Sequence, residues 1–84
     1  MSNQIELKVV VNGTPTTVTA NVNAPLKTII PEALKKTGNV GQPPENWLIK
    51  DAAGNELNRD EKISSFGFTG DTVLYLSLGA GIGG

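Results

Sequence analysis

Three glycines near the end of the sequence have a spacing that suggests chemistry. Gly79, Gly81 and Gly84 follow a strand-like run, residues 73–78, as G-x-G-x-x-G. This is the spacing of a loop that binds a dinucleotide pyrophosphate. Such a loop also needs a helix that begins at the glycines and an acidic residue about 20 positions further on. The sequence given contains neither after Gly84, so we expect no dinucleotide site.

Composition limits the classes of function. The 84 residues include no cysteine and no histidine, so disulfides, thiolate ligands, a cysteine nucleophile and the commonest general base are excluded. The net charge is −1, and no basic cluster is interleaved with aromatic residues, so we expect no nucleic-acid binding. No apolar run is long enough to span a membrane, and residues 1–8 lack the features of a secretory signal. We therefore expect one cytoplasmic domain that is not an enzyme and holds no metal or cofactor.

Two runs in the first quarter of the chain alternate apolar and polar residues, which is the period of a half-buried β-strand. They are residues 5–11 and 18–22, on either side of the turn-forming pair Asn12-Gly13. Together they predict a β-hairpin. We expect Pro15 to lie in the loop between the two strands.

The segment 24–39 has apolar residues three and four positions apart, which places them on one face of a helix. Gly38 suits the left-handed conformation that ends a helix. Pro31 would cost about 3 kcal/mol in a helix interior. We therefore expect either Thr28 as the N-cap, with Pro31 in the first turn, or a bent first turn. The expected apolar face is Leu26, Ile29, Ile30, Ala33 and Leu34.

The second half of the sequence predicts further strands around a loop. Residues 47–50 and 73–78 have strand patterns, residues 56–57 a very short one, and residues 58–68 carry apolar anchors on a loop with one helical turn. This order predicts an α+β domain, with one helix packed across a mixed sheet of four or five strands. The first and last strands alternate most clearly, so we expect them to be central. The core-facing residues expected in the last strand are Leu74, Leu76 and Leu78.

Several motifs in this order resemble ubiquitin and its β-grasp relatives. Residues 41–57, GQPPENWLIKDAAGNEL, combine a Gly, a Pro-Pro pair, an acidic residue and a strand with Leu-Ile, as ubiquitin does after its helix. Residues 71–78, DTVLYLSL, resemble its last strand, and Gly83-Gly84 matches its diglycine end. The resemblance covers nearly the whole chain. It implies a ubiquitin-like β-grasp domain over residues 1–78 and a flexible Gly-rich tail over residues 79–84.

This resemblance implies a protein modifier and gives the glycines a physical purpose. An activating enzyme must bring a C-terminal carboxylate through a narrow channel to the α-phosphate of ATP, and a thiol then captures the acyl adenylate. Glycine has no side chain to block the channel. Gly84 is therefore the expected attachment point, on a tail that reaches about 20 Å beyond the last strand. The residues expected to contact the activating enzyme are Gly79, Ala80, Gly81, Ile82 and Gly83.

The tail and the surface differ from those of ubiquitin. The tail lacks the arginines and the leucine that precede ubiquitin's diglycine. Lys50 and Ser77 stand in place of its exposed isoleucine and valine, and the first loop, residues 12–16, is polar. We therefore expect a separate bacterial system, with its own activating enzyme, conjugating enzyme and JAB-type or other isopeptidase, that joins a monomeric modifier to target proteins. The activating enzyme consumes ATP, and the modifier binds none.

Two other functions stay open from the sequence. Sulfur carriers for thiamine, molybdopterin or tRNA thiolation share the β-grasp fold, the diglycine and adenylation, but they end in a thiocarboxylate. A third class is an interaction domain with an inert tail, since chain ends are commonly disordered. The Pro-Pro segment and the hairpin-helix layout favour the modifier.

Other conspicuous residues have simple interpretations. Trp47, the only tryptophan, is expected to be partly buried on its strand, with docking of a partner as the alternative. Residues 60–62 predict a solvated turn, where nothing nearby would shift a pKa. The lysines are expected to be solvated, and the sequence does not select one as an acceptor for another copy's Gly84. They are Lys8, Lys27, Lys35, Lys36, Lys50 and Lys62.

Overall fold

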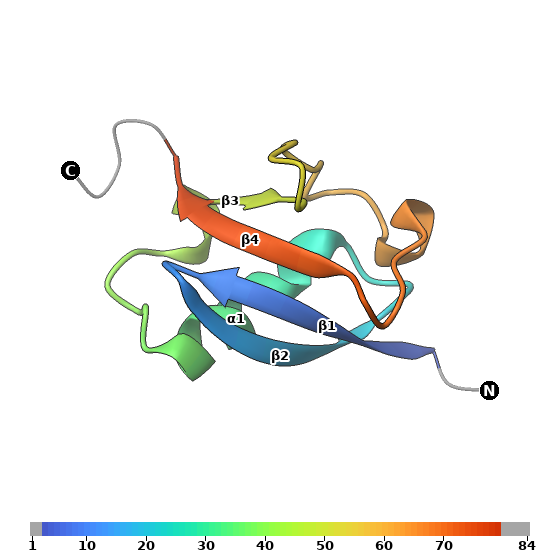
Figure 1. The fold of residues 1–84 in the computed structure, drawn as a ribbon, viewed down its shortest axis with the longest axis horizontal. Coiled ribbons are helices and arrows are strands. Elements are labelled where there is room, and N and C mark those ends of the chain that lie inside the picture. The colour runs from blue at the N-terminus through green and yellow to red at the C-terminus, as the bar shows by residue number, and fades with distance from the viewer. Residues whose placement is uncertain (1–2, 80–84) are drawn as a thin grey trace.

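The computed structural model describes residues 3–79 and contains a four-stranded sheet with one helix packed across it (Figure 1). The strands are β1 (Gln4–Val11), β2 (Thr14–Asn21), β3 (Trp47–Lys50) and β4 (Val73–Leu78), and the helix is α1 (Ile30–Thr37). Three 3₁₀ turns connect them: η1 (Leu26–Ile29), η2 (Pro44–Asn46) and η3 (Ile63–Phe66). The predicted α+β architecture is confirmed, and the sheet has four strands.

The sheet order is β2-β1-β4-β3, so the first and last strands are central as predicted. β1 and β4 are parallel, with Lys8 opposite Val73 and Val11 opposite Leu76. The other two pairs are antiparallel. Because parallel strands end at the same edge, the turn after β1 lies beside the end of β4. Figure 1 shows both at the left of the molecule.

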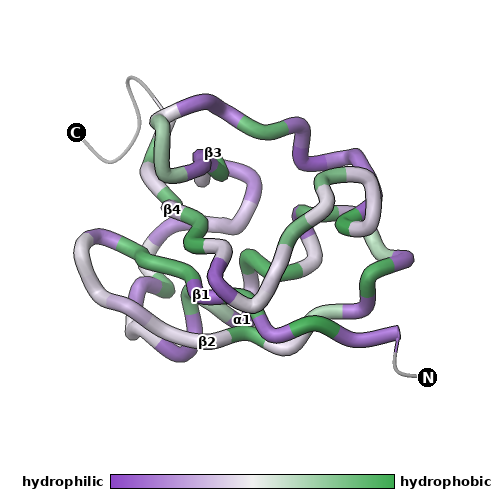
Figure 2. Tube along the Cα trace, turned by 45° about the vertical axis from the view of Figure 1, so that its right-hand side comes forward, coloured by the Kyte–Doolittle hydropathy of each residue, from purple (hydrophilic) through white to green (hydrophobic). Residues whose placement is uncertain are grey.

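One core lies between the sheet and α1. Every residue of the predicted helix face is buried, and so are Leu74 and Leu76, while Leu78 is half-buried. Hydrophobic and hydrophilic residues alternate along most of β1 (Figure 2). Successive side chains of a strand point to opposite faces of the sheet, so one set lies in this core. The buried residues of the sheet are Leu7, Val9, Val11, Val18, Ala20, Trp47, Ile49, Leu74 and Leu76.

The prediction for Pro15 is wrong, because this residue lies inside β2 and pairs with Val10. Asn12 and Gly13 both have positive φ angles, 51° and 80°. Two such residues form the tight turn whose twist matches a hairpin, so the second strand resumes at Thr14. Proline is tolerated there because β2 is an edge strand of the sheet.

The start of the helix follows the second of the two expectations. Thr28 is not the N-cap, since its hydroxyl donates to the carbonyl oxygen of Pro25 at 2.7 Å. The first turn is instead bent into η1, and Pro31 lies at the beginning of α1, where its missing N–H costs little. Gly38 ends the helix in the left-handed conformation with a φ of 75°, as predicted.

One segment differs in detail from the prediction. Instead of a short strand at residues 56–57, a single bridge joins Glu56 to Lys50, and the N–H of Leu57 donates to Ile49. The segment before β3 contains the turn η2. The predicted helical turn among the later apolar anchors is confirmed as η3.

Candidate functional site

The end of β4 is the candidate site, because the glycine-rich segment starts there. Gly79 donates its backbone N–H to the carbonyl oxygen of Asn46 at 3.0 Å, and Leu78 pairs with Trp47. The main chain is therefore held against the start of β3 up to Gly79. The other expected contact residues and the expected attachment point lie outside the described residues: Ala80, Gly81, Ile82, Gly83 and Gly84.

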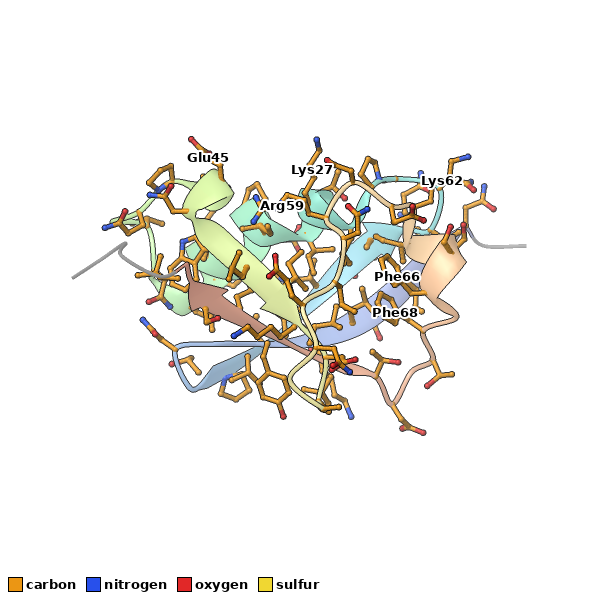
Figure 3. All side chains as sticks on the ribbon, turned by 90° about the horizontal axis from the view of Figure 1, so that it is seen from above. Lys27, Glu45, Arg59, Lys62, Phe66 and Phe68 are labelled. Atoms are coloured by element: carbon orange, nitrogen blue, oxygen red, sulfur yellow. The ribbon has the colours of Figure 1, made fainter. Side chains whose placement is uncertain are left out.

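Arg59 holds the segment on which this exit rests. Its guanidinium donates to the carbonyl oxygens of Trp47 and Glu45, the latter at 3.4 Å. The carbonyl oxygen of Arg59 accepts the N–H of Lys27 at 2.9 Å, which attaches the same loop to η1. Figure 3 shows Arg59, Lys27 and Glu45 along one side of the molecule. The sequence analysis missed Arg59, because main-chain carbonyl acceptors leave no pattern of side chains.

A hollow of about 200 Å³ opens beside the exit. Four segments line it: the turn after β1, the stretch after α1, the start of β3 and the end of β4. None of its lining residues is charged. The turn and the stretch are joined, since the side-chain amide of Asn12 donates to the Oδ1 of Asn39 at 3.2 Å. The lining residues are Asn12, Gly38, Asn39, Gly41, Gln42, Trp47 and Leu78.

Val40 stands between two of these lining residues and is 72% exposed. Among the large hydrophobic residues that the structure describes, only Val40 and Tyr75 are exposed. We call Asn12, Asn39, Val40 and Gln42 together the tail-exit surface. It combines three side-chain amides with one apolar contact.

Trp47 is 2% exposed, so it is fully buried rather than partly buried as predicted, and its interpretation as a structural residue of the strand is confirmed. Its buried ring offers no face for docking. The indole Nε1 is also buried and has no hydrogen-bond partner among residues 3–79. A buried donor without an acceptor costs roughly 1–3 kcal/mol.

The charged groups lie mostly in pairs or in solvent. Lys27 contacts Asp60 at 3.1 Å and Lys36 contacts Glu32 at 3.3 Å, both at exposed positions. Residues 60–62 are exposed, as predicted. Such surface pairs contribute little to stability. In the described part of the chain, no three His, Cys, Asp or Glu residues group as a metal site would require, and no helix is long and apolar enough to cross a bilayer.

Asp51 forms a compact turn after β3. Its carboxylate accepts the backbone N–H groups of Asn55 and Ala53 at 2.9 and 3.0 Å. These bonds, that from Asn55 first, favour the charged carboxylate and hold its pKa below the ordinary value. The shift is explained by the turn itself and indicates no catalytic group.

The sheet face away from α1 exposes Tyr75, the second of the two exposed large hydrophobic residues that the structure describes. Tyr75 is 40% exposed and lies in register with Val10 on one side and Lys50 on the other. Lys50 and Ser77, which stand in place of ubiquitin's exposed isoleucine and valine, are both half-buried.

Comparisons with known proteins identify relatives of the whole chain. A family described as "Protein of Unknown function (DUF2604)" matches residues 1–84. The uncharacterized protein y4jI of Sinorhizobium fredii (strain NBRC 101917 / NGR234) is 53% identical over 81 residues, 96% of this chain. The chain spans 62% of the length of that relative.

Solved structures show the fold. The chain matches a de novo design based on ubiquitin with a TM-score of 0.76 at 20% identity, covering 98% of this chain and 96% of the design. It matches the ubiquitin of Caldiarchaeum subterraneum with a TM-score of 0.72 at 19% identity, covering 96% and 99%. The N-terminal ubiquitin-like domain of the 4931431F19Rik protein gives 0.74 at 12% identity, covering 100% and 83%. The fold is therefore ubiquitin-like.

Proposed function

This chain belongs to the family described as Protein of Unknown function (DUF2604), and we propose that it is a ubiquitin-like modifier joined to target proteins through Gly84. One relationship carries the proposal. In a ubiquitin-like fold, the central strand β4 runs directly into a segment that contains Gly83-Gly84, and the body holds the start of that segment at Gly79. A rigid head then presents a narrow segment to another protein.

The proposed chemistry takes place in partner enzymes. The Gly84 carboxylate attacks the α-phosphorus of ATP, and pyrophosphate leaves. A thiol of the activating or conjugating enzyme attacks the acyl adenylate, and AMP leaves. An amine or a hydroxyl of the target then attacks the thioester, and the thiol leaves as an isopeptide or ester bond forms. Glycine at positions 83 and 84 leaves the attacked carbonyl free of side-chain obstruction. An isopeptidase would hydrolyse the isopeptide bond with water and release the Gly84 carboxylate and the target amine.

Mass spectrometry of the protein from its own host tests this proposal. We expect covalent adducts with other proteins from the unaltered chain, and none after deletion of Gly84 or the substitution Gly83→Val. Gly70→Ala is the matched control, since a Cβ at this exposed glycine meets no atom within 4 Å. It should form adducts normally. The mass of the free protein also defines its mature C-terminus.

Two outcomes would overturn the proposal. Replacement of one oxygen by sulfur on the free protein, without adducts, would identify a sulfur carrier. Neither adducts nor sulfur would identify a domain that acts by non-covalent binding alone.

A further inference from the structure

We propose that the enzyme that receives the tail docks on the tail-exit surface and recognises it through uncharged groups. This inference rests on the proposed function and adds the location and chemistry of the first contact. The partner would offer peptide carbonyls, amides or hydroxyls to Asn12, Asn39 and Gln42, and an apolar side chain to Val40.

The length of the segment limits where this enzyme can bind. The expected attachment point, Gly84, is the fifth residue after Gly79, and an extended chain spans at most about 3.4 Å per residue. The attacked carbonyl therefore lies within about 17 Å of the fixed Gly79. An enzyme that encloses that carbonyl must approach the body around the exit. The hollow lies beside this exit, since its lining includes Leu78.

The chemistry of the surface decides how recognition can occur. The lining of the hollow contains three side-chain amides and no charged residue, and residues 79–84 have no charged side chain. Ion pairs with side chains are therefore not available from these positions. The side chain of Val40 is 72% exposed, so it can make an apolar contact with a partner. Hydrogen bonds around an apolar contact are the usual composition of a small interface, and they depend weakly on salt.

The amides are held in place before binding. Asn12 donates to Asn39, whose own side-chain nitrogen donates to the Thr37 hydroxyl at 2.8 Å. The Oε1 of Gln42 accepts from Asn46 at 2.9 Å, so Gln42 keeps its NH₂ group for a partner. Groups that are already ordered lose little freedom when a partner binds.

The test measures conjugation in an extract of the host, supplied with ATP and tagged protein. We compare Val40→Asp and Gln42→Glu with Ser65→Asp, an exposed position on η3, which is the orange turn at the opposite end in Figure 1. Val40→Asp and Gln42→Glu each place an unpaired charge in a neutral interface. Each should therefore slow adduct formation at least about tenfold. Ser65→Asp should match the unaltered chain. Thermal unfolding of the purified variants confirms that all three are folded.

The outcomes separate this inference from the proposed function. If the unaltered chain forms adducts and Val40→Asp and Gln42→Glu form them equally fast, the docking surface lies elsewhere and the modifier function stands. A steep fall in rate as salt is raised would overturn the uncharged recognition. If the unaltered chain forms no adducts at all, the proposed function fails, and this inference fails with it.

Discussion

Gly79 and Asn46 are joined by a backbone hydrogen bond of 3.0 Å, which fixes the point where the chain leaves the folded body. Asn46 is itself held, because its side chain donates to Gln42 and its N–H donates to the carbonyl of Pro43. The exit, the hollow and the turn before β3 therefore form one connected unit. A substitution in any of them should therefore change how Gly79 is held.

The first prediction concerns Arg59. Replacing Arg59 by Ala leaves the carbonyls of Trp47 and Glu45 without this donor. We expect the free energy of unfolding to fall by about 1–3 kcal/mol, because the charged donor is lost from the partly buried carbonyl of Trp47 and from the exposed carbonyl of Glu45. Urea denaturation measures the change. Lys62→Ala is the control, since this exposed cation has no ion pair among residues 3–79, and an equal loss in that variant would contradict the role given to Arg59.

The second prediction concerns the turn between β1 and β2. Asn12 has a φ of 51°, a conformation that costs a residue with a Cβ roughly 1–2 kcal/mol and costs glycine little. Asn12→Ala and Asn12→Gly both remove the bond to Asn39. The alanine variant should therefore be less stable than the glycine variant by about 1 kcal/mol. Thermal denaturation of the pair measures this difference, and equal stabilities would mean that the turn has relaxed.

Most of the fold could be predicted from periodicity. The apolar spacing gave the buried face of α1 and the inward set of β1 and β4, because one side of each element must be removed from water. Pro15 was placed wrongly because its tolerance depends on β2 being an edge strand, which is a property of the assembled sheet. Of the two helix starts left open by the sequence, Thr28 as the N-cap is not adopted, because its hydroxyl bonds locally to Pro25.

Less of the candidate site could be predicted. The expected tail contacts follow from residue type, but their surroundings do not. Asn12 and Asn39 are 27 positions apart, and only the parallel placement of β1 and β4 brings the first turn to the exit. No sequence pattern identifies Val40 as an exposed residue of the site. A hollow assembled from four separate segments is visible only in three dimensions.

The third prediction concerns acid stability. The pKa of Asp51 is lowered in the folded state. At pH values between the folded and the unfolded pKa, the folded protein therefore binds fewer protons than the unfolded chain. Its contribution is present above the unfolded pKa of about 3.9 and is lost as the pH falls through the lower folded pKa. Asp51→Asn should therefore be less stable than the unaltered chain at neutral pH. The gap should close below about pH 4, as measured by denaturation at a series of pH values.

A matched variant isolates the cause of this pH dependence. Asn55→Ala removes the weak side-chain contact to Asp51 at 3.4 Å but keeps the backbone N–H that bonds at 2.9 Å. It should retain most of the pH dependence, because the backbone bond from Asn55 is the largest cause of the shift. If Asn55→Ala lost it, the side-chain amide would be the main partner of the carboxylate.

The fourth prediction concerns the boundary between the body and the tail. One shortened protein ends after Gly79 and a second ends after Leu78, so the two differ only in the residue that donates to Asn46. We expect the shorter protein to be less stable by about 1 kcal/mol, the usual contribution of one backbone hydrogen bond. Urea denaturation of both proteins measures the difference. A gap below about 0.5 kcal/mol, the lower end of that range, would show that the Gly79 bond does not fix the exit and that the body ends at Leu78.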